Sequence, residues 1–204
     1  SYGADTVTTG SGADIVYTFN GDDVITIDGA GNKTIDGGIG TDSLTINVSG
    51  NPSLGSYSLA RNGESLILTD TNNNVIQYKN IENLTVGAHS YSEVVDGHDG
   101  RKLYSLWSAS EKVLYIYHGT EGVWDGIDSL SGLSGSDDFS VIGTDGQDHM
   151  SLSRNNFSGK FTMSMGGGDD SIGTATLKDG DSVDMGTGDD TVRMAVTDYA
   201  TLNL

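Results

Sequence analysis

Short triplets that begin with a polar residue and end with an aliphatic one recur along the first 45 residues, at intervals of nine or ten positions. Each triplet begins with a polar residue two positions after a glycine and ends with an aliphatic residue. Because strand side chains alternate between two faces and glycine-rich segments favour turns, this pattern predicts short β-strands joined by tight turns. The triplets are Asp5-Thr6-Val7, Asp14-Ile15-Val16, Asp23-Val24-Ile25, Lys33-Thr34-Ile35 and Asp42-Ser43-Leu44.

The same pattern returns, less regularly, between residues 143 and 198. Four aspartates there follow glycine-rich segments, and each stands two positions before a large apolar residue. They are Asp148, Asp170, Asp181 and Asp190, separated by 22, 11 and 9 positions. Recurrence of one short unit is the sequence signature of a repeat architecture, so both blocks predict stacked turns.

Residues 46–134 interrupt the pattern and predict antiparallel strands. Residues 65–70 and 75–79 flank Thr-Asn-Asn-Asn, which is typical of a hairpin turn. Residues 102–107 and 112–118 flank Ser-Ala-Ser-Glu and predict a second hairpin. No convincing amphipathic helix interrupts these strands, so the whole chain is expected to be all-β.

Composition narrows the possible partners. The formal net charge is −19, and 24 of the 29 acidic residues are Asp. Nucleic acid is excluded as a partner and an anionic membrane surface is disfavoured, because both need a basic footprint. The chain has no Cys, so disulfides and thiolate sites are excluded, and no apolar run is long enough to span a membrane. An excess of Asp over Glu instead favours turns and the binding of hard cations.

The repeats resemble the nonapeptide G-G-x-G-x-D-x-U-x of RTX proteins, in which U is a large aliphatic residue. The resemblance implies that six residues form a turn, three form a strand, and Ca²⁺ is bound by turn carbonyls and the aspartates. It also implies two nonapeptides per coil, so that Asp5 stacks near Asp23, and Asp23 near Asp42. Lys33 replaces the aspartate of one copy, and its ammonium would either end the calcium row or replace an ion there. The expected ligands are Asp5, Asp14, Asp23, Asp42, Asp148, Asp170, Asp181 and Asp190.

The arrangement of repeats, aromatic β-insert and repeats resembles the ligand-binding domains of bacterial RTX adhesins, in particular their calcium-dependent peptide-binding domains. It implies one domain over residues 1–204, with an antiparallel β-sandwich-like body at 46–134 and RTX-like repeats at 1–45 and 143–198. The repeats would form either a regular β-roll or short calcium-bearing turns on the edge of that body. The chain starts within the pattern, as expected of a piece of a longer protein.

The same resemblance implies a function and a location. We expect the extracellular part of a bacterial surface adhesin that binds a short peptide or protein C-terminus on a host or neighbouring cell. Several calcium ions would stabilise it, and one could contact a ligand carboxylate directly. The alternatives are a lectin-like module that binds glycans through calcium, a purely structural spacer, and an ice-binding solenoid, which the interruption disfavours. The chain carries neither a G-x-S-x-G motif nor a P-loop, so we expect no enzyme.

Two candidate sites lie outside the repeats. Asp96 and Asp99 flank Gly-His and could hold a Ca²⁺ that a ligand completes, although a plain turn explains them as well. Trp124 precedes Asp125 and Asp128, and this group could form a platform for a ligand. The alternative is a buried tryptophan followed by a polar turn.

Tyr115 and Tyr117 form a third candidate. They alternate with Leu114 and Ile116, so one face of the predicted strand is aromatic and the other aliphatic. Tyrosine is favoured at binding surfaces, which makes this stripe a candidate ligand contact. Packing against a neighbouring strand is the commoner fate of such a stripe.

Overall fold

A computed structural model describes residues 2–47, 49, 52–95, 102–117, 135–150, 158–196 and 200–204. The chain divides into two compact units, Ser1–Glu93 and Val94–Leu204. Apart from one short 3-10 turn, Leu54–Ser56, the regular elements of the described residues are β-strands. In this part of the chain, no helix has the length and apolarity needed to cross a membrane. The broad all-β prediction is confirmed, and the expectation of one domain over residues 1–204 stays a prediction.

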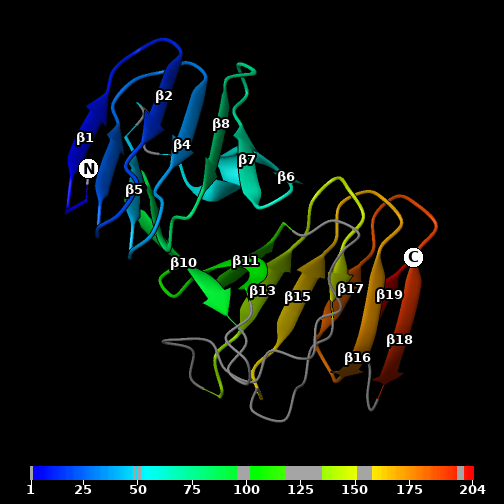
Figure 1. Cartoon of the computed structure of the whole chain (residues 1–204). Helices are drawn as coiled ribbons and strands as arrows, with labels where there is room; N and C mark the ends of the chain where they lie inside the picture. Colours follow the sequence, from blue (N-terminus) through cyan, green and yellow to red (C-terminus); the bar gives the residue numbers. More distant parts are fainter. Residues whose placement is uncertain are drawn as a thin grey trace. The chain divides into compact units, whose positions relative to one another are not determined.

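The first unit is a parallel β-solenoid (Figure 1). One sheet stacks β1 (Thr6–Thr9), β3 (Val24–Ile27), β5 (Ser43–Ile46) and β9 (Asn83–Val86) in parallel. The other stacks β2 (Asp14–Tyr17), β4 (Lys33–Asp36) and β8 (Val75–Lys79). Thr6 pairs with Val24 and Val24 with Ser43, so each regular coil contains two nonapeptides, as the repeat predicts.

A longer third coil carries the antiparallel strands of this unit. Between β5 and β8 the chain forms β6 (Ser58–Asn62) and β7 (Ser65–Thr69), which extend the second sheet as an antiparallel meander. The hairpin predicted at residues 65–79 is therefore confirmed. Asp70 holds its turn, since Oδ1 accepts the backbone N–H groups of Asn72 and Asn74 at 2.8 Å each. β10 (His89–Val95) then pairs antiparallel with β9.

The core of the first unit follows the period-two pattern of its triplets. In β3 and β5 the aliphatic residues Ile25, Ile27, Leu44 and Ile46 are completely buried. The residues between them, such as Thr26, face away from the core. Parallel coils bring equivalent positions into register, so each aliphatic side chain packs on its counterpart one coil away.

The second unit is also built from parallel coils. Its longer sheet holds β11 (Lys102–Ser108), β12 (Val113–Ile116), β13 (Phe139–Ile142), β15 (Phe161–Ser164), β17 (Ser182–Asp184) and β19 (Thr201–Asn203). The shorter sheet holds β14 (His149–Met150), β16 (Ser171–Leu177) and β18 (Thr191–Val196). All pairs are parallel except β11 with β12, which form the second predicted hairpin.

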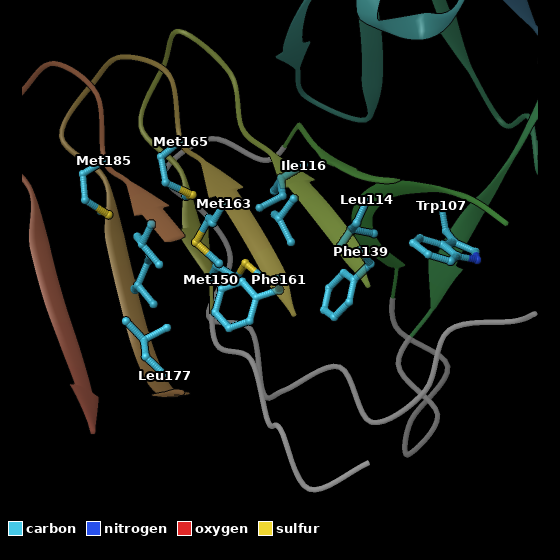
Figure 2. Close-up of a cluster of buried hydrophobic side chains, with 13 residues drawn as sticks. Trp107, Leu114, Ile116, Phe139, Met150, Phe161, Met163, Met165, Leu177 and Met185 are labelled. Atoms are coloured by element: carbon cyan, nitrogen blue, oxygen red, sulfur yellow. The ribbon is translucent and has the colours of Figure 1, made fainter. Parts of the chain in front are cut away.

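Methionine fills the core of this unit (Figure 2). Met150, Met163, Met165 and Met185 are at most 2% exposed and pack with the aromatic and aliphatic residues of the cluster. Coil length varies here, because Phe139 pairs with Phe161 whereas Ser182 pairs with Thr201. Unbranched, flexible side chains fill irregular gaps well, which suits a core built from unequal coils.

The prediction of an antiparallel β-sandwich-like body is wrong. The described strands of residues 46–134 join the edges of parallel sheets and do not form a body of their own. β8 and β9, for example, lie parallel to β4 and β5 of the preceding coil. Alternating polarity predicts that a strand exists and which face is buried, but stacking of coils decides its neighbour, and stacked coils pair in parallel.

Candidate calcium-binding turns

The first residue of each repeat triplet lies at the corner where a turn enters a strand. Asp23 and Asp42 have the same pleat phase as the core residues two positions later, so their carboxylates turn inward. Both are buried, with at most 1% of their surface exposed. The first acidic row is the stack of four such corners along the first unit: Asp5, Asp23, Asp42 and Glu82.

Backbone hydrogen bonds link each member of the first acidic row to the next. Asp5 N–H donates to Asp23 Oδ1 at 2.7 Å, and Asp23 N–H donates to Asp42 Oδ1 at 2.8 Å. Asp42 N–H donates to Glu82 Oε2 at 2.8 Å. The predicted stacking of Asp5, Asp23 and Asp42 is confirmed. Glu82 was missed because no glycine stands two positions before it, although Glu82-Asn83-Leu84 keeps the polar-to-aliphatic triplet.

The second unit contains an equivalent stack. The second acidic row consists of Asp148, Asp170 and Asp190, in which Asp148 N–H donates to Asp170 Oδ1 at 2.8 Å and Asp170 N–H to Asp190 Oδ1 at 2.9 Å. Thr144 donates both its N–H and its hydroxyl to Asp148 Oδ2 at 2.7 and 3.0 Å. One kind of corner thus recurs in both units.

Four carboxylates of the two acidic rows each have one oxygen that accepts no hydrogen bond. Asp23 Oδ2, Asp42 Oδ2, Asp148 Oδ1 and Asp170 Oδ2 are buried and lack a hydrogen-bond partner among the described residues. A buried carboxylate without compensation is costly when ionised. Burial accordingly raises the pKa of Asp148 to about 6. Burial and the neighbouring carboxylates raise the pKa of Asp170 to about 7.

Main-chain carbonyls crowd around the same corners. A methyl group built on Gly37 would overlap Asn80 O and lie 2.6 Å from Asp42 Oδ2. A methyl group on Gly143 would overlap Met165 O and lie 2.8 Å from Asp148 Oδ2. Each glycine therefore borders a carboxylate oxygen and a carbonyl oxygen of the neighbouring coil, and oxygen is the ligand that Ca²⁺ prefers. The described residues hold no group of three Asp, Glu or His side chains placed for a metal, so a cation bound at these corners would also need carbonyl ligands.

Replacement of Gly143 by Ala should destabilise the second acidic row. The added methyl group has to displace Met165 O or the Asp148 carboxylate, and overpacking of this kind costs about 1–3 kcal/mol. We expect a lower thermal midpoint and weaker calcium binding, measured by scanning calorimetry and calcium titration. Gly10→Ala is the matched control, because a methyl group there meets nothing within 4 Å. Equal losses in the two variants would show that the close approach at Gly143 is unimportant.

Two predicted ligands have other partners. Asp14 Oδ2 is also buried without a hydrogen-bond partner among the described residues, but unlike the oxygens of the acidic rows it lies 3.1 Å from an ammonium, that of Lys33. Asp181 is buried, but both its oxygens accept backbone N–H groups, from Phe161 at 3.0 Å and from Lys178 at 2.8 Å. The structure therefore brings six of the eight repeat aspartates into the two acidic rows, whereas Asp14 and Asp181 lie at other corners.

The predicted ligand-contact stripe of Tyr115 and Tyr117 is wrong. Both side chains are buried, with 4% and 6% of their surface exposed. β12 lies between β11 and β13, and Leu114, Tyr115 and Ile116 are all buried, so this strand is covered on both faces. Alternation of aliphatic and aromatic residues marks two faces without telling which one is exposed. The other candidates, Asp96, Asp99, Trp124, Asp125 and Asp128, lie outside the described residues.

Comparisons with known proteins add little to this geometry. No protein-family model matches the chain. No curated protein matches it either. A solved structure that resembles it is the extracellular lipase LipA from Serratia marcescens, with a TM-score of 0.37 and 20% sequence identity. The similarity covers 98% of this chain but only 32% of the lipase. A likeness at this level supports no statement about the activity of this chain.

Proposed function

We propose that this chain is a β-solenoid module of an extracellular protein and that calcium ions, bound along the two acidic rows, stabilise its fold. The observation that carries the proposal is the set of buried carboxylate oxygens without donors at equivalent corners of both units. A bound Ca²⁺ would supply the positive charge and take the oxygen ligands that these corners offer. The net charge of −19 agrees with a chain whose carboxylates are neutralised by cations.

Three features of the chain suit these corners to binding a cation. The pleat phase buries the carboxylates. A backbone N–H of the preceding coil fixes one oxygen of Asp23, Asp42 and Asp170, and Thr144, four residues earlier, fixes one oxygen of Asp148. The second oxygen is left for a cation. Glycine at positions such as Gly37 and Gly143 lets the neighbouring carbonyl approach. Asp23, Asp42, Asp148 and Asp170, together with turn carbonyls, are the residues that would hold the metal.

We further propose that the module belongs to a bacterial surface adhesin and binds a peptide or protein terminus. The resemblance of its repeats to the nonapeptides of RTX proteins, the class to which RTX adhesins belong, supports the adhesin. A second observation supports peptide binding: Ile15, Tyr17, Phe19 and Ile39 are between 57% and 72% exposed. We call these residues the β2 stripe. Exposed apolar and aromatic groups of this kind are typical of binding surfaces.

The topology around the β2 stripe favours an extended ligand. β2 pairs with β4. Ile15 and Tyr17 occupy alternate, outward positions along it. An extended peptide places its side chains alternately, so every second one can lie against such groups. Glycan binding through calcium and a purely structural role are the competing functions.

A binding array tests the ligand. The calcium-loaded chain is applied to peptides with free C-termini and to glycans, and the assay is repeated in excess chelator. We expect binding to peptides that is lost when calcium is removed. In Tyr17→Ala the affinity for these peptides should fall at least tenfold. Leu204→Ala is the control, since Leu204 is also exposed but lies outside the stripe. Hits on glycans alone would support the lectin-like function, and a blank array with folded protein would support the spacer.

A further inference from the structure

The opposite edge of the first unit carries a third row of corners with a different composition. Strand pairing aligns Asp14 with Lys33 and Lys33 with Ile76. We call these three residues the Lys33 row. Asp14 and Lys33 are the first residues of β2 and β4, and Ile76 is the second residue of β8. The aspartates of the first acidic row similarly stand at the start of their strands, one residue before β1, β3 and β5. A row of carboxylates is thus replaced by one carboxylate, one ammonium and one aliphatic side chain.

The ammonium of Lys33 lies inside this corner. Its side chain is completely buried, and Nζ lies 3.1 Å from Asp14 Oδ2. Nζ also donates a hydrogen bond to Gly12 O. Lysine is almost never fully buried unless its charge is paired, so burial here depends on these oxygens. A carboxylate oxygen and a turn carbonyl oxygen also meet beside Gly37 in the first acidic row, so Lys33 is held by the same two kinds of oxygen.

The turns of the Lys33 row stack as closely as those of the acidic rows. A methyl group on Gly31 would overlap Gly12 O, and one on Gly40 would overlap Gly21 O. Both glycines have positive φ angles, 125° and 154°. The turn geometry is therefore shared by the two edges, and the cation is what differs between them.

We infer that the Lys33 ammonium occupies the position that a calcium ion takes in the acidic rows, so that this edge of the solenoid closes without metal. The inference rests on the proposed calcium binding. Within the row, Lys33 balances the charge of Asp14 and Ile76 carries none, so a divalent cation at this corner would lack a carboxylate of its own. Asp14 is then a counter-ion of Lys33 and not a calcium ligand.

The second unit has a metal-independent edge of another kind. Phe139 and Phe161 are aligned at the corners that begin β13 and β15, and their rings stack with centroids 6.0 Å apart. Asp181, in the following coil, has both oxygens occupied by backbone N–H groups. Each unit thus pairs one acidic row with one edge that is closed by side chains. Calcium is confined to one edge of each solenoid.

Counting bound calcium in matched variants tests this inference. Asp14→Asn and Asp42→Asn remove the same charge from the two edges of one unit. After equilibration with calcium, ions per chain are counted by native mass spectrometry. We expect Asp14→Asn to bind as many ions as the unmodified chain and Asp42→Asn to bind one fewer. Loss of an ion in Asp14→Asn would overturn the inference, whereas an unmodified chain that binds none would overturn the proposed calcium binding itself.

A gain-of-site variant decides the question if Asp14→Asn does not fold. Lys33→Asp restores the carboxylate of the nonapeptide and should bind one ion more than the unmodified chain. Its thermal midpoint should also depend more steeply on calcium concentration, because each additional bound ion adds to the linkage. Lys33→Met is the control, as it removes the ammonium and offers no ligand, so it should gain no ion. An equal ion count in Lys33→Asp and Lys33→Met would overturn the inference.

Discussion

Removal of calcium is expected to unfold most of the solenoid. An ion bound at a concentration about 1,000-fold above its Kd stabilises the folded chain by about 4 kcal/mol. One site in each acidic row would then account for most of the roughly 5–15 kcal/mol that stabilises a typical domain. Without the ions, the unpartnered oxygens of residues such as Asp42 and Asp170 remain buried. The strand signal in circular dichroism should fall sharply in excess chelator and return when calcium is restored.

Magnesium is the control for that experiment. Mg²⁺ carries the same charge but demands octahedral geometry and keeps several of its waters, so corners built from carbonyls and single carboxylates should not accept it. We expect magnesium to leave the chelated chain unfolded. A thermal midpoint that is the same in calcium and in chelator would contradict the proposed function.

Asp170→Asn is expected to have opposite effects with and without calcium. In calcium, the variant loses a charged ligand, and its thermal midpoint should fall by about 5 °C or more. In the metal-free chain, the same change removes a buried charge that repels Asp148 and Asp190, so stability should rise. The amide oxygen can still accept the N–H of Asp148, which isolates the effect of charge from that of the hydrogen bond.

The pH of the measurement sets the size of the metal-free effect. The carboxyl of Asp170 has a pKa of about 7 in the folded chain and an ordinary value of 3.8. Because the folded pKa is raised, the unfavourable contribution of the ionised group is absent below 3.8, accumulates as the pH rises from there to about 7, and is complete above that value. Asp170→Asn should therefore stabilise the metal-free chain more at pH 8 than at pH 5. Asp179→Asn is the control, since Asp179 is exposed and outside both acidic rows. A uniform shift in all conditions would contradict a ligand role for Asp170.

The solenoid itself follows from features that the sequence displays. The resemblance of the regularly spaced triplets to the RTX nonapeptide implies two triplets per coil, and the pairing of Thr6 with Val24 confirms it. The polar start of each triplet predicts the stacked carboxylates. The hairpin between residues 65 and 79 follows from its Asn-rich turn, whose Asn73 has a φ of 62°. These are local or strictly periodic signals, which a single sequence carries in full.

The remaining features depend on contacts between distant segments. Glu82 completes the first acidic row only because Ser43 pairs with Asn83 across the long third coil, whose inserted strands hide the repeat. Tyr115 is buried because both faces of its strand are covered by other parts of the fold. Lys33 could be read from the sequence either as the end of a calcium row or as a substitute for an ion. Its contact with Asp14 favours the substitute, and only a three-dimensional structure provides that contact.

The hydrogen bonds of the acidic rows set the order in which the coils of each solenoid can close during synthesis. Beyond the first corner of each row, every acidic side chain accepts the N–H of the corner in the coil that precedes it, as Asp42 accepts from Asp23 and Glu82 from Asp42. A ribosome makes the donor of each bond before its acceptor. A nascent coil therefore stays open until the corner that begins the next coil has been made. The first unit can close its row only when Glu82 has emerged, which makes its longest coil the last step of its assembly.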